Sequence, residues 1–585
     1  MNSFFIIIRY MKSSFQSLWF FFILLGLVIV GSMIIELAPP FLIMKIIDEH
    51  LVRGVFDGVW KLALLYFGAF ILSNLLNIGK SLLTTYIAQH VLLELRLVMA
   101  KHLSKLSMKY YHRTPVGETM SRLTVDVDAV NALFSTGLIS TITDCLKVFG
   151  IIAAMYLISP TLCFIALLAI PAIYIFSNMV RKKMFRGQTE IRQKVSAINT
   201  FIQELYSGIR TVKAYGKEEF YKDRFQAPIE EHLVARNRVS RYDSCFPVIL
   251  QIIRAFTIIC ILWFGAKTGL PGSVGVTVGG LAALADLIGR LFSPIENLAQ
   301  EYQNIQQARA GMRRIAEFLM EPTEERGELQ KLESASDFDF KQVQVQLQNV
   351  SFGYSDRKMI TKNVSMTIQP GKKVAIIGRT GAGKTTLLQL IAGLYGTQTG
   401  SISISGFDPF RMEPSLKRKM IGIVPQTVHI FEGTIRDNIT LRDSLIDQEA
   451  IEHATRAVGL HEAILTLPNA YETMLGESGS KLSFGQMQLL SLARAIVTDP
   501  PLLLLDEPTS GMDAVTEGAI FQALRTICEG RTIITISHRL SGIIDADEVY
   551  IMDNGRIAQS GTPDELAGEK GWYSVFKQLE ELGWQ

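Results

Sequence analysis

A glycine-rich stretch in the second half of the chain has the residue types and the spacing of a phosphate-binding loop. The pattern G-x-x-x-x-G-K-[ST] is matched by Gly378, Arg379, Thr380, Gly381, Ala382, Gly383, Lys384 and Thr385, and Thr386 follows directly. Glycines allow the backbone to curl so that several N–H groups point at one anion near a helix N-terminus. In such a loop Lys384 reaches the β- and γ-phosphates of a nucleoside triphosphate, and the Thr385 hydroxyl binds Mg²⁺. The alternative is an ordinary glycine-rich turn, which the Lys-Thr pair disfavours.

The segments around this loop predict the strand and the helix that position it. Residues 374–377 are an apolar run typical of a buried strand, and residues 387–392 are expected to form a helix. A second apolar run, 502–505, ends in Asp506 and Glu507. Because ligands bind beyond the carboxyl ends of parallel strands, we expect Asp506 to bind Mg²⁺ and Glu507 to polarise an attacking water. Taken alone, the second run would also fit a strand followed by a helix cap.

The composition indicates that the chain has two parts, one apolar and one typical of a soluble domain. The chain has 585 residues, of which 48% are hydrophobic and 19% are charged, and its mean hydropathy is +0.25. This length predicts several domains. The net charge of +3 is too small to indicate a nucleic-acid partner. The five cysteines show no C-x-x-C spacing, so neither a zinc site nor a disulfide framework is expected.

The N-terminal half contains stretches that are long and apolar enough to cross a membrane, which takes about 20 residues. The first stretch could pass for a signal peptide, but its apolar run is too long and no small-residue cleavage site follows it. The second is the weakest because Asn74, Asn77 and Lys80 interrupt it. Six spans are predicted, at 18–44, 60–88, 135–158, 161–180, 246–265 and 278–298.

Basic residues set the expected orientation of these spans. Lys and Arg are concentrated before the first span, between the second and third, and between the fourth and fifth. Cytoplasmic loops carry this excess, so both termini are expected in the cytoplasm. Apolar residues recur at helical spacing in 89–108 and 187–241, which predicts that the membrane helices continue into the cytoplasm and turn at 111–118 and 214–219. The alternative for these segments is solvated loops.

Several ionisable residues lie inside the predicted spans, where charge is costly and indicates a substrate cavity or a structural pair. Glu36, just before a Pro-Pro pair, and Arg254 are the better cavity candidates. Asp144, Lys147 and Arg290 lie near the ends of their spans. We therefore expect these three to pair structurally or to extend toward the membrane interface.

A charged segment that contains Pro and Glu, at 321–342, predicts a linker between two domains. We expect a transmembrane domain at 1–320 and a second domain at 343–585, which begins with an alternating, antiparallel strand at 343–350. The expected fold is an α-helical transmembrane bundle of six spans with long cytoplasmic helical extensions, followed by an α/β P-loop domain.

The order of these motifs resembles the exporter type of the ATP-binding cassette (ABC) transporters over nearly the whole chain. The resemblance implies that 343–585 is an ATP-binding cassette in which Tyr354 stacks on adenine. It also implies that Gln426 senses Mg²⁺ and faces the membrane domain, and that His538 is the switch histidine. Residues 476–479 resemble the segment that precedes the family signature, and 510–513 resemble a dimer-contact loop. The turns near Gly117 and Gly216 resemble the coupling loops that dock onto the cassettes.

The segment 482–486 is similar to the family signature, which acts in a dimer. The resemblance implies two ATP sites between two cassettes, where Ser483, Gly485 and Gln486 contact the γ-phosphate bound by the facing chain. The usual signature is L-S-G-G-Q, and Phe484 replaces its first glycine. A glycine permits close approach to phosphate, which a phenyl side chain impairs. With Glu507 intact, this pattern favours a heterodimer with a second ABC half-transporter over a homodimer.

The sequence therefore predicts ATP-driven, Mg²⁺-dependent export of an amphipathic drug, lipid or peptide across the lipid bilayer by alternating access. An ATP-gated or regulatory membrane protein is the alternative, which the intact Glu507 and His538 disfavour. The membrane half excludes a soluble cassette protein that acts on nucleic acid. The expected absence of a leading peptidase domain disfavours a leader-cleaving peptide exporter, and the expected absence of a transit peptide favours a bacterial cytoplasmic membrane.

Overall fold

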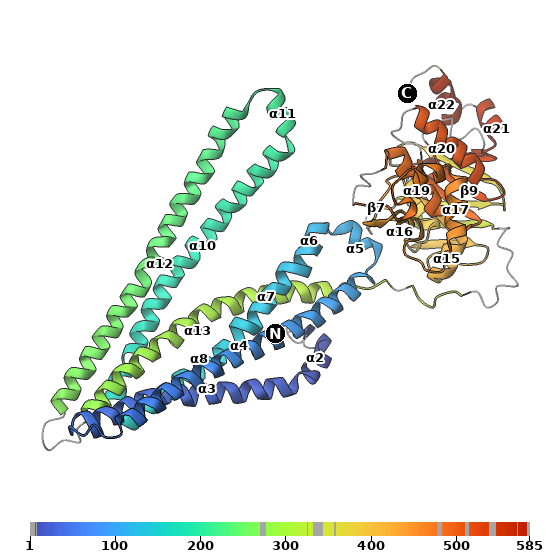
Figure 1. The fold of residues 1–585 in the computed structure, drawn as a ribbon. Helices are drawn as coiled ribbons and strands as arrows, with labels where there is room; N and C mark the ends of the chain where they lie inside the picture. Colours follow the sequence, from blue (N-terminus) through green and yellow to red (C-terminus); the bar gives the residue numbers. More distant parts are fainter. Residues whose placement is uncertain are drawn as a thin grey trace. The chain divides into compact units, whose positions relative to one another are not determined.

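The chain forms two compact units (Figure 1). The helical unit comprises residues 1–106 and 114–322, and the sheet unit comprises residues 107–113 and 323–585. The computed structural model describes residues 6–7, 9–268, 276–324, 326–331, 343–355, 358–476, 482–508, 514–537, 546–569 and 571–581.

Long helices of membrane-crossing length make up the helical unit. Five of the predicted spans overlap helical stretches that are long and apolar enough to cross a bilayer. The remaining predicted span, 161–180, falls on α9 and the start of α10, where several side chains are not described, so the number six stays a prediction. Among the described residues the five stretches are Trp19–Leu51, Val59–Leu103, Val116–Ile158, Glu218–Gly265 and Val278–Leu298.

Several of these helices continue far beyond an apolar span, as the helical spacing of their apolar residues predicted. Helices α10 and α12 lie side by side and are joined through α11 (Figure 1). Gly216, with φ +58°, allows the turn before α12. The helices of this unit are α2 (Lys12–Ser17), α3 (Trp19–Lys45), α4 (Val59–Leu103), α6 (Val116–Ser121), α7 (Val127–Ala132), α8 (Ile139–Ile158), α9 (Pro160–Leu167), α10 (Ala169–Ser207), α11 (Ile209–Ala214), α12 (Glu218–Thr268) and α13 (Val278–Leu319), with π-helical stretches at Ile46–Leu51, Arg122–Asp126 and Leu133–Leu138.

One segment that was expected to be a turn contains helical residues. Residues 111–118 were expected to form a turn, but they belong to two short helices, α5 (Met108–Arg113) and α6. Pro115 separates the two because it has no N–H to continue α5 and its φ of −58° suits the residue before α6. Helix α5 packs with the sheet unit rather than with the helical unit.

Apolar side chains are distributed over the helical unit as a membrane protein requires. Ile261, Leu284 and Leu287 are fully buried in a core between α8, α9, α12 and α13. By contrast, Trp60 and Leu64 on α4 are mostly exposed in the isolated chain. Because lipid tails are as apolar as these side chains, the exposed faces suit contact with a bilayer.

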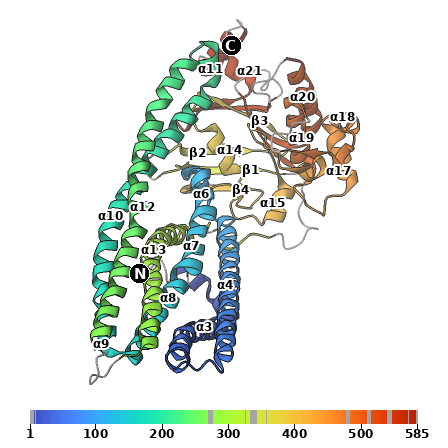
Figure 2. The same ribbon diagram turned by 60° about the vertical axis from the view of Figure 1, so that its left-hand side comes forward.

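The sheet unit, in which Figure 2 labels strands β1 to β4, is built on a six-stranded sheet with the order β11-β10-β3-β9-β8-β5. All neighbouring strands in it are parallel except β10 and β11. The predicted strand at 343–350 is present as β1, which pairs with β2 and β4 in an antiparallel sheet. The strands are β1 (Val345–Phe352), β2 (Thr361–Ile368), β3 (Lys373–Gly378), β4 (Thr399–Ile404), β5 (Ile421–Val424), β6 (Gly433–Thr434), β7 (Met474–Leu475), β8 (Leu502–Asp506), β9 (Thr532–Ile536), β10 (Glu548–Asp553) and β11 (Arg556–Gly561).

The register of this sheet brings the predicted motifs to one edge. Ile376 of β3 and Asp506 of β8 are both paired with Ile536 of β9, so β8 and β3 end near one another on either side of β9, with β3 extending two residues further. Strands β3 and β8 are almost entirely buried, which explains their continuous apolar runs. The helices around them are α14 (Lys384–Ile391), α15 (Pro414–Met420), α16 (Ile435–Thr440), α17 (Gln448–Ala457), α18 (His461–Leu465), α19 (Phe484–Ile496), α20 (Ala514–Ile527), α21 (Pro563–Gly568) and α22 (Trp572–Glu581).

Candidate functional site

The loop between β3 and α14 has the backbone geometry that its glycines predicted. Gly378 ends β3 with φ +149°, and a Cβ atom added there would lie 2.1 Å from the carbonyl oxygen of Met552 on β10. Gly381 and Gly383 also have positive φ, of +83° and +99°. Any residue with a Cβ atom would be strained in these conformations. The sharp turn into α14 therefore depends on glycine.

Lys384 begins α14 and folds back over this loop. Its ammonium group donates hydrogen bonds to the carbonyl oxygens of Gly378, at 2.8 Å, and Arg379, at 3.2 Å. Burial lowers the pKa of Lys384, while the carboxylates of Glu507 and Asp506 oppose that change. The ammonium therefore lies at the loop, where phosphate oxygens can replace the backbone carbonyls as acceptors.

Asp506 and Thr385 converge at the ends of β8 and β3. The Thr385 hydroxyl lies 3.5 Å from Asp506 Oδ1. The pKa of Asp506 is raised to about 6, mainly by burial and to a smaller extent by the charge of Glu507. A carboxylate and a hydroxyl are the hard oxygen ligands that Mg²⁺ prefers, and a nearby cation would offset the cost of ionising a buried carboxyl group. These two residues therefore fit a Mg²⁺ site.

Glu507 and Gln426 form a hydrogen-bonded pair beside this position. The Gln426 amide donates to Glu507 Oε2 at 2.8 Å. Glu507 has φ +48°, an uncommon conformation for a residue with a side chain, and its N–H donates to Ile536 O at 3.2 Å. The strained backbone turns the carboxylate away from β8 toward Gln426, which follows β5.

Tyr354, the expected adenine-stacking residue, is held by contacts to α14. Its hydroxyl group lies 3.1 Å from Thr386 Oγ1 and donates to Gln389 Oε1 at 2.9 Å. The ring of His112, on α5, stacks on Tyr354 with centroids 4.9 Å apart and planes at 4°. A ring face of Tyr354 is thus available for stacking, and an imidazole uses it in this structure.

The signature segment begins helix α19. Ser483 is the N-cap, its hydroxyl group accepts from the Gln486 N–H, and the Gln486 side chain accepts from the Ser483 N–H. Gly485 is buried. Phe484 is the first residue of the helix and is 53% exposed.

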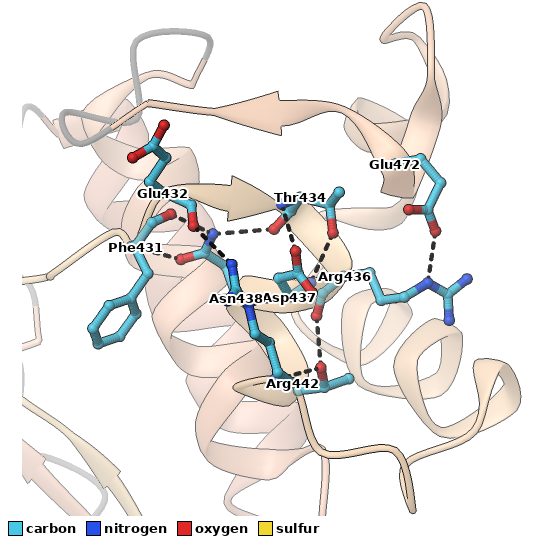
Figure 3. A network of polar contacts seen from close by, with 9 residues as sticks. Phe431, Glu432, Thr434, Arg436, Asp437, Asn438, Arg442 and Glu472 are labelled. Atoms are coloured by element: carbon cyan, nitrogen blue, oxygen red, sulfur yellow. Dashed lines mark hydrogen bonds and ion pairs between the residues drawn. The ribbon is translucent and has the colours of Figure 1, made fainter. Parts of the chain in front are cut away.

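Figure 3 shows a polar network in the segment after Gln426 that the sequence reasoning missed. The fully buried Asn438 side chain donates to the carbonyl oxygens of Phe431, at 2.8 Å, and Thr434, at 3.0 Å, and accepts from the Phe431 N–H. Arg494 of α19 donates to the Asn438 backbone and side chain. Only the Thr434-x-x-Asp437 capping box, which starts α16, gave a sequence signal for this region.

Three predicted features lie outside the described residues. They are His538, the 477–479 part of the segment before the signature, and the expected dimer-contact loop 510–513.

The structure shows ion pairs for two of the charges within the predicted spans. Asp144, Lys147 and Arg290 were expected to pair structurally or to extend toward the membrane interface. Lys147 and Arg290 do form ion pairs, and all three residues also line a cavity of about 220 Å³ together with Glu36. Lys147 Nζ lies 2.6 Å from Glu36 Oε2, an ion pair that lacks the angle of a hydrogen bond. Arg290 pairs with Asp286 on its own helix, as the i,i+4 spacing allows, and also donates to Glu36 O. Arg254 lies against Gly289.

These two units define a membrane transporter with a nucleotide-binding domain. Residues 21–295 match the family model of the ABC transporter transmembrane region, and residues 361–510 match the model described as ABC transporter. The chain belongs to the ABC transporter family, as a multi-pass membrane protein of the exporter type that carries both domains on one polypeptide, as a half-transporter does.

Individual relatives agree with that assignment over most of their length. The chain is 32% identical over 526 residues to the probable multidrug resistance ABC transporter ATP-binding/permease protein YheH of Bacillus subtilis, covering 90% of this chain and 77% of that protein. It is 30% identical to the leukotoxin translocation ATP-binding protein LktB of Mannheimia haemolytica, covering 94% and 76%. The fold is similar to that of a bacterial Atm1-family ABC exporter solved with ATP bound, with a TM-score of 0.76, 24% identity, and coverage of 96% and 98%.

Proposed function

We propose that this chain is one half of an exporter that hydrolyses ATP to move a small amphipathic substrate out of the cytoplasm by alternating access. The observation that carries this proposal is the convergence of groups at one edge of the sheet. Lys384 and the pair Thr385–Asp506 lie beside the hydrogen-bonded pair Gln426–Glu507. The other unit of the same chain has helices of membrane-crossing length around polar cavities.

Each of these groups has a distinct task in the proposal. Lys384 and the loop N–H groups bind the β- and γ-phosphates. Thr385 and Asp506, with Gln426 nearby, hold Mg²⁺, which when bound neutralises charge on the phosphates. Glu507 accepts a proton from the attacking water, and the Gln426 amide fixes the direction of that carboxylate. His538, whose role rests on the resemblance, is the remaining catalytic residue of the proposal.

Replacing Glu507 tests the proposed catalytic base. Glu507→Gln keeps the size of the side chain but removes its basicity, so we expect ATP turnover to fall about a hundredfold or more while ATP binding stays within about twofold. Glu449→Gln, an exposed position at the start of α17, is the matched control and should leave both unchanged. Near-normal hydrolysis by Glu507→Gln would refute the assigned role.

The proposal includes a second ABC half-transporter. Ser483, Gly485 and Gln486 lie at the start of α19 and would complete an ATP site only on a facing cassette. Phe484 is exposed at this surface, where it would weaken the contact of this signature with phosphate. This supports pairing with a different chain, because the weakened signature would then complete the ATP site bound by that second chain. Transport-coupled ATPase activity from a purified homodimer would contradict the heterodimer. Bacterial relatives support a cytoplasmic membrane location, with both termini inside from the distribution of basic residues.

A further inference from the structure

A second polar cavity in the helical unit has no part in ATP chemistry. It has a volume of about 440 Å³, which suits a small organic ligand, and it is lined by residues of α4, α8 and α13 and of the π-helical stretch before α8. Most of the lining groups are hydroxyl-bearing or charged. The four ionisable side chains among them are Lys80, Asp144, Lys147 and Glu301.

Two of these four charges are already compensated within the chain. Lys147 is paired with Glu36, which lies in the neighbouring cavity. Asp144 accepts a hydrogen bond from the side chain of Asn297. These groups therefore need no ligand to offset their burial.

Glu301 is different because one of its oxygen atoms is buried without a partner. The residue is 5% exposed, and Oε2 has no hydrogen-bond partner among the described residues. The hydroxyl groups of Thr141 and Ser140 lie close enough to interact with this carboxylate, but they donate to the carbonyl oxygens of Gly137 and Ser135. The hydroxyl groups of Ser135 and Thr143, which line the cavity, likewise donate to the carbonyl oxygens of Asn131 and Ile139. Their free lone pairs add acceptors to the same cavity. An unpartnered buried carboxylate oxygen among acceptors is costly and matches a ligand with an ammonium group.

Lys80 provides the opposite charge in the same cavity. Among the residues that the structure describes it forms no ion pair at contact distance, and the charges of Glu36 and Asp144 act on it only from farther away. A cavity with one carboxylate and one ammonium group that form no ion pair among the described residues is complementary to a ligand that carries both charges. We infer that this cavity binds a zwitterionic substrate, with the substrate's ammonium group at Glu301 and its carboxylate at Lys80.

This inference rests on the proposed function and names the charge class of the exported substrate. In the predicted topology Lys80 lies toward the cytoplasmic end of the second span, and Glu301 follows the sixth span on the cytoplasmic side. A substrate would thus load from the cytoplasm, as export requires. Amphipathic substrates with a single charge or none would leave at least one of the two side chains unpaired.

Four forms of one dipeptide test the inference. Leucylphenylalanine is a zwitterion, its N-acetyl form an anion, its C-terminal amide a cation, and the doubly blocked form is neutral. Binding of each to the purified full-length chain without nucleotide is measured by calorimetric titration. We expect the zwitterion to bind most tightly, and blocking either end to weaken binding at least about tenfold.

The variants assign each charge to one side chain. Glu301→Gln should remove the preference for a free amine and keep the preference for a free carboxylate, whereas Lys80→Met should do the reverse. Glu317→Gln, a partly exposed position on α13 paired with Arg313, is the control and should bind like the unchanged protein. Equal binding of all four forms, no binding at millimolar concentration, or an unchanged amine preference in Glu301→Gln would overturn the inference. A protein without ATPase activity would instead refute the proposed function, and the binding result would stand independently.

Discussion

Replacing glycines of the phosphate loop by alanine should distinguish the cost of backbone strain from the cost of a steric clash of the added Cβ atom. Gly378 and Gly381 both have positive φ, so alanine is strained at either position. Only at Gly378 does the added Cβ meet backbone, 2.1 Å from Met552 O, whereas at Gly381 no atom lies within 4 Å. An ordinary carbon–oxygen contact is about 3.3 Å, so β10 would have to move by about 1 Å relative to β3.

These distances set the expected magnitudes. Strain alone at Gly381→Ala should cost about 1 kcal/mol, whereas strain plus overpacking at Gly378→Ala should cost about 3–5 kcal/mol. For a domain of this size each kcal/mol lowers Tm by about 2–4 °C. Gly378→Ala should therefore lower the Tm of the sheet unit by about 10 °C, and Gly381→Ala by about 3 °C.

Thermal unfolding of the purified chain, followed with and without ATP, measures both effects. We expect Gly378→Ala to weaken ATP binding more than about tenfold, because the loop moves with β3, and Gly381→Ala to weaken it only about threefold. Equal shifts in Tm for the two variants would refute the geometric reasoning, as would a shift below about 2 °C for Gly378→Ala.

Three further predictions concern the same unit. Because the pKa of Asp506 is raised to about 6, the carboxyl group binds a proton below that pH, and apparent Mg²⁺ affinity in nucleotide-binding titrations should fall up to about tenfold per pH unit there; a flat profile from pH 7.5 to 5 would contradict this. Gln426→Ala, which removes the donor to Glu507, should slow steady-state hydrolysis at least about tenfold with little change in ATP affinity, and an equal loss of both would point to misfolding. Asn438→Ala leaves buried groups of Phe431 and Thr434 unpaired and should lower the Tm of the sheet unit by about 5–10 °C; an unchanged Tm would show the network to be dispensable.

The nucleotide site was predictable because its parts are short, contiguous motifs. The positive φ values of Gly378 and Gly383 follow from the loop pattern itself, and the buried β8 places Asp506 and Glu507 at the edge of a parallel sheet. The strained conformation of Glu507 and its contact with Gln426 depend on a separate strand, β5, and could not be read from either motif.

The charged cavities were less predictable for a physical reason. Hydropathy gives the depth of a residue in a span but not the direction in which its side chain faces, because that depends on how each helix packs against the others. Lys147 lies near the end of its span and was expected to pair structurally or to extend toward the interface, but its partner, Glu36 of another helix, could not be predicted. Likewise, Pro115 indicated a break in the chain but not the short helices on either side of it.

The most direct test of the central claim is ATP-driven flux in proteoliposomes. The protein, with its second chain, is reconstituted so that the sheet units face the external solution, and uptake of an amphipathic cationic dye, a fluorescent lipid analogue and labelled leucylphenylalanine is followed. Our account predicts that at least one probe accumulates against its gradient when Mg²⁺ and ATP are added, and that Glu507→Gln abolishes this accumulation. ATP-dependent flux that only equilibrates the probes, or hydrolysis without movement of any of them, would contradict an exporter and indicate a gated or regulatory protein.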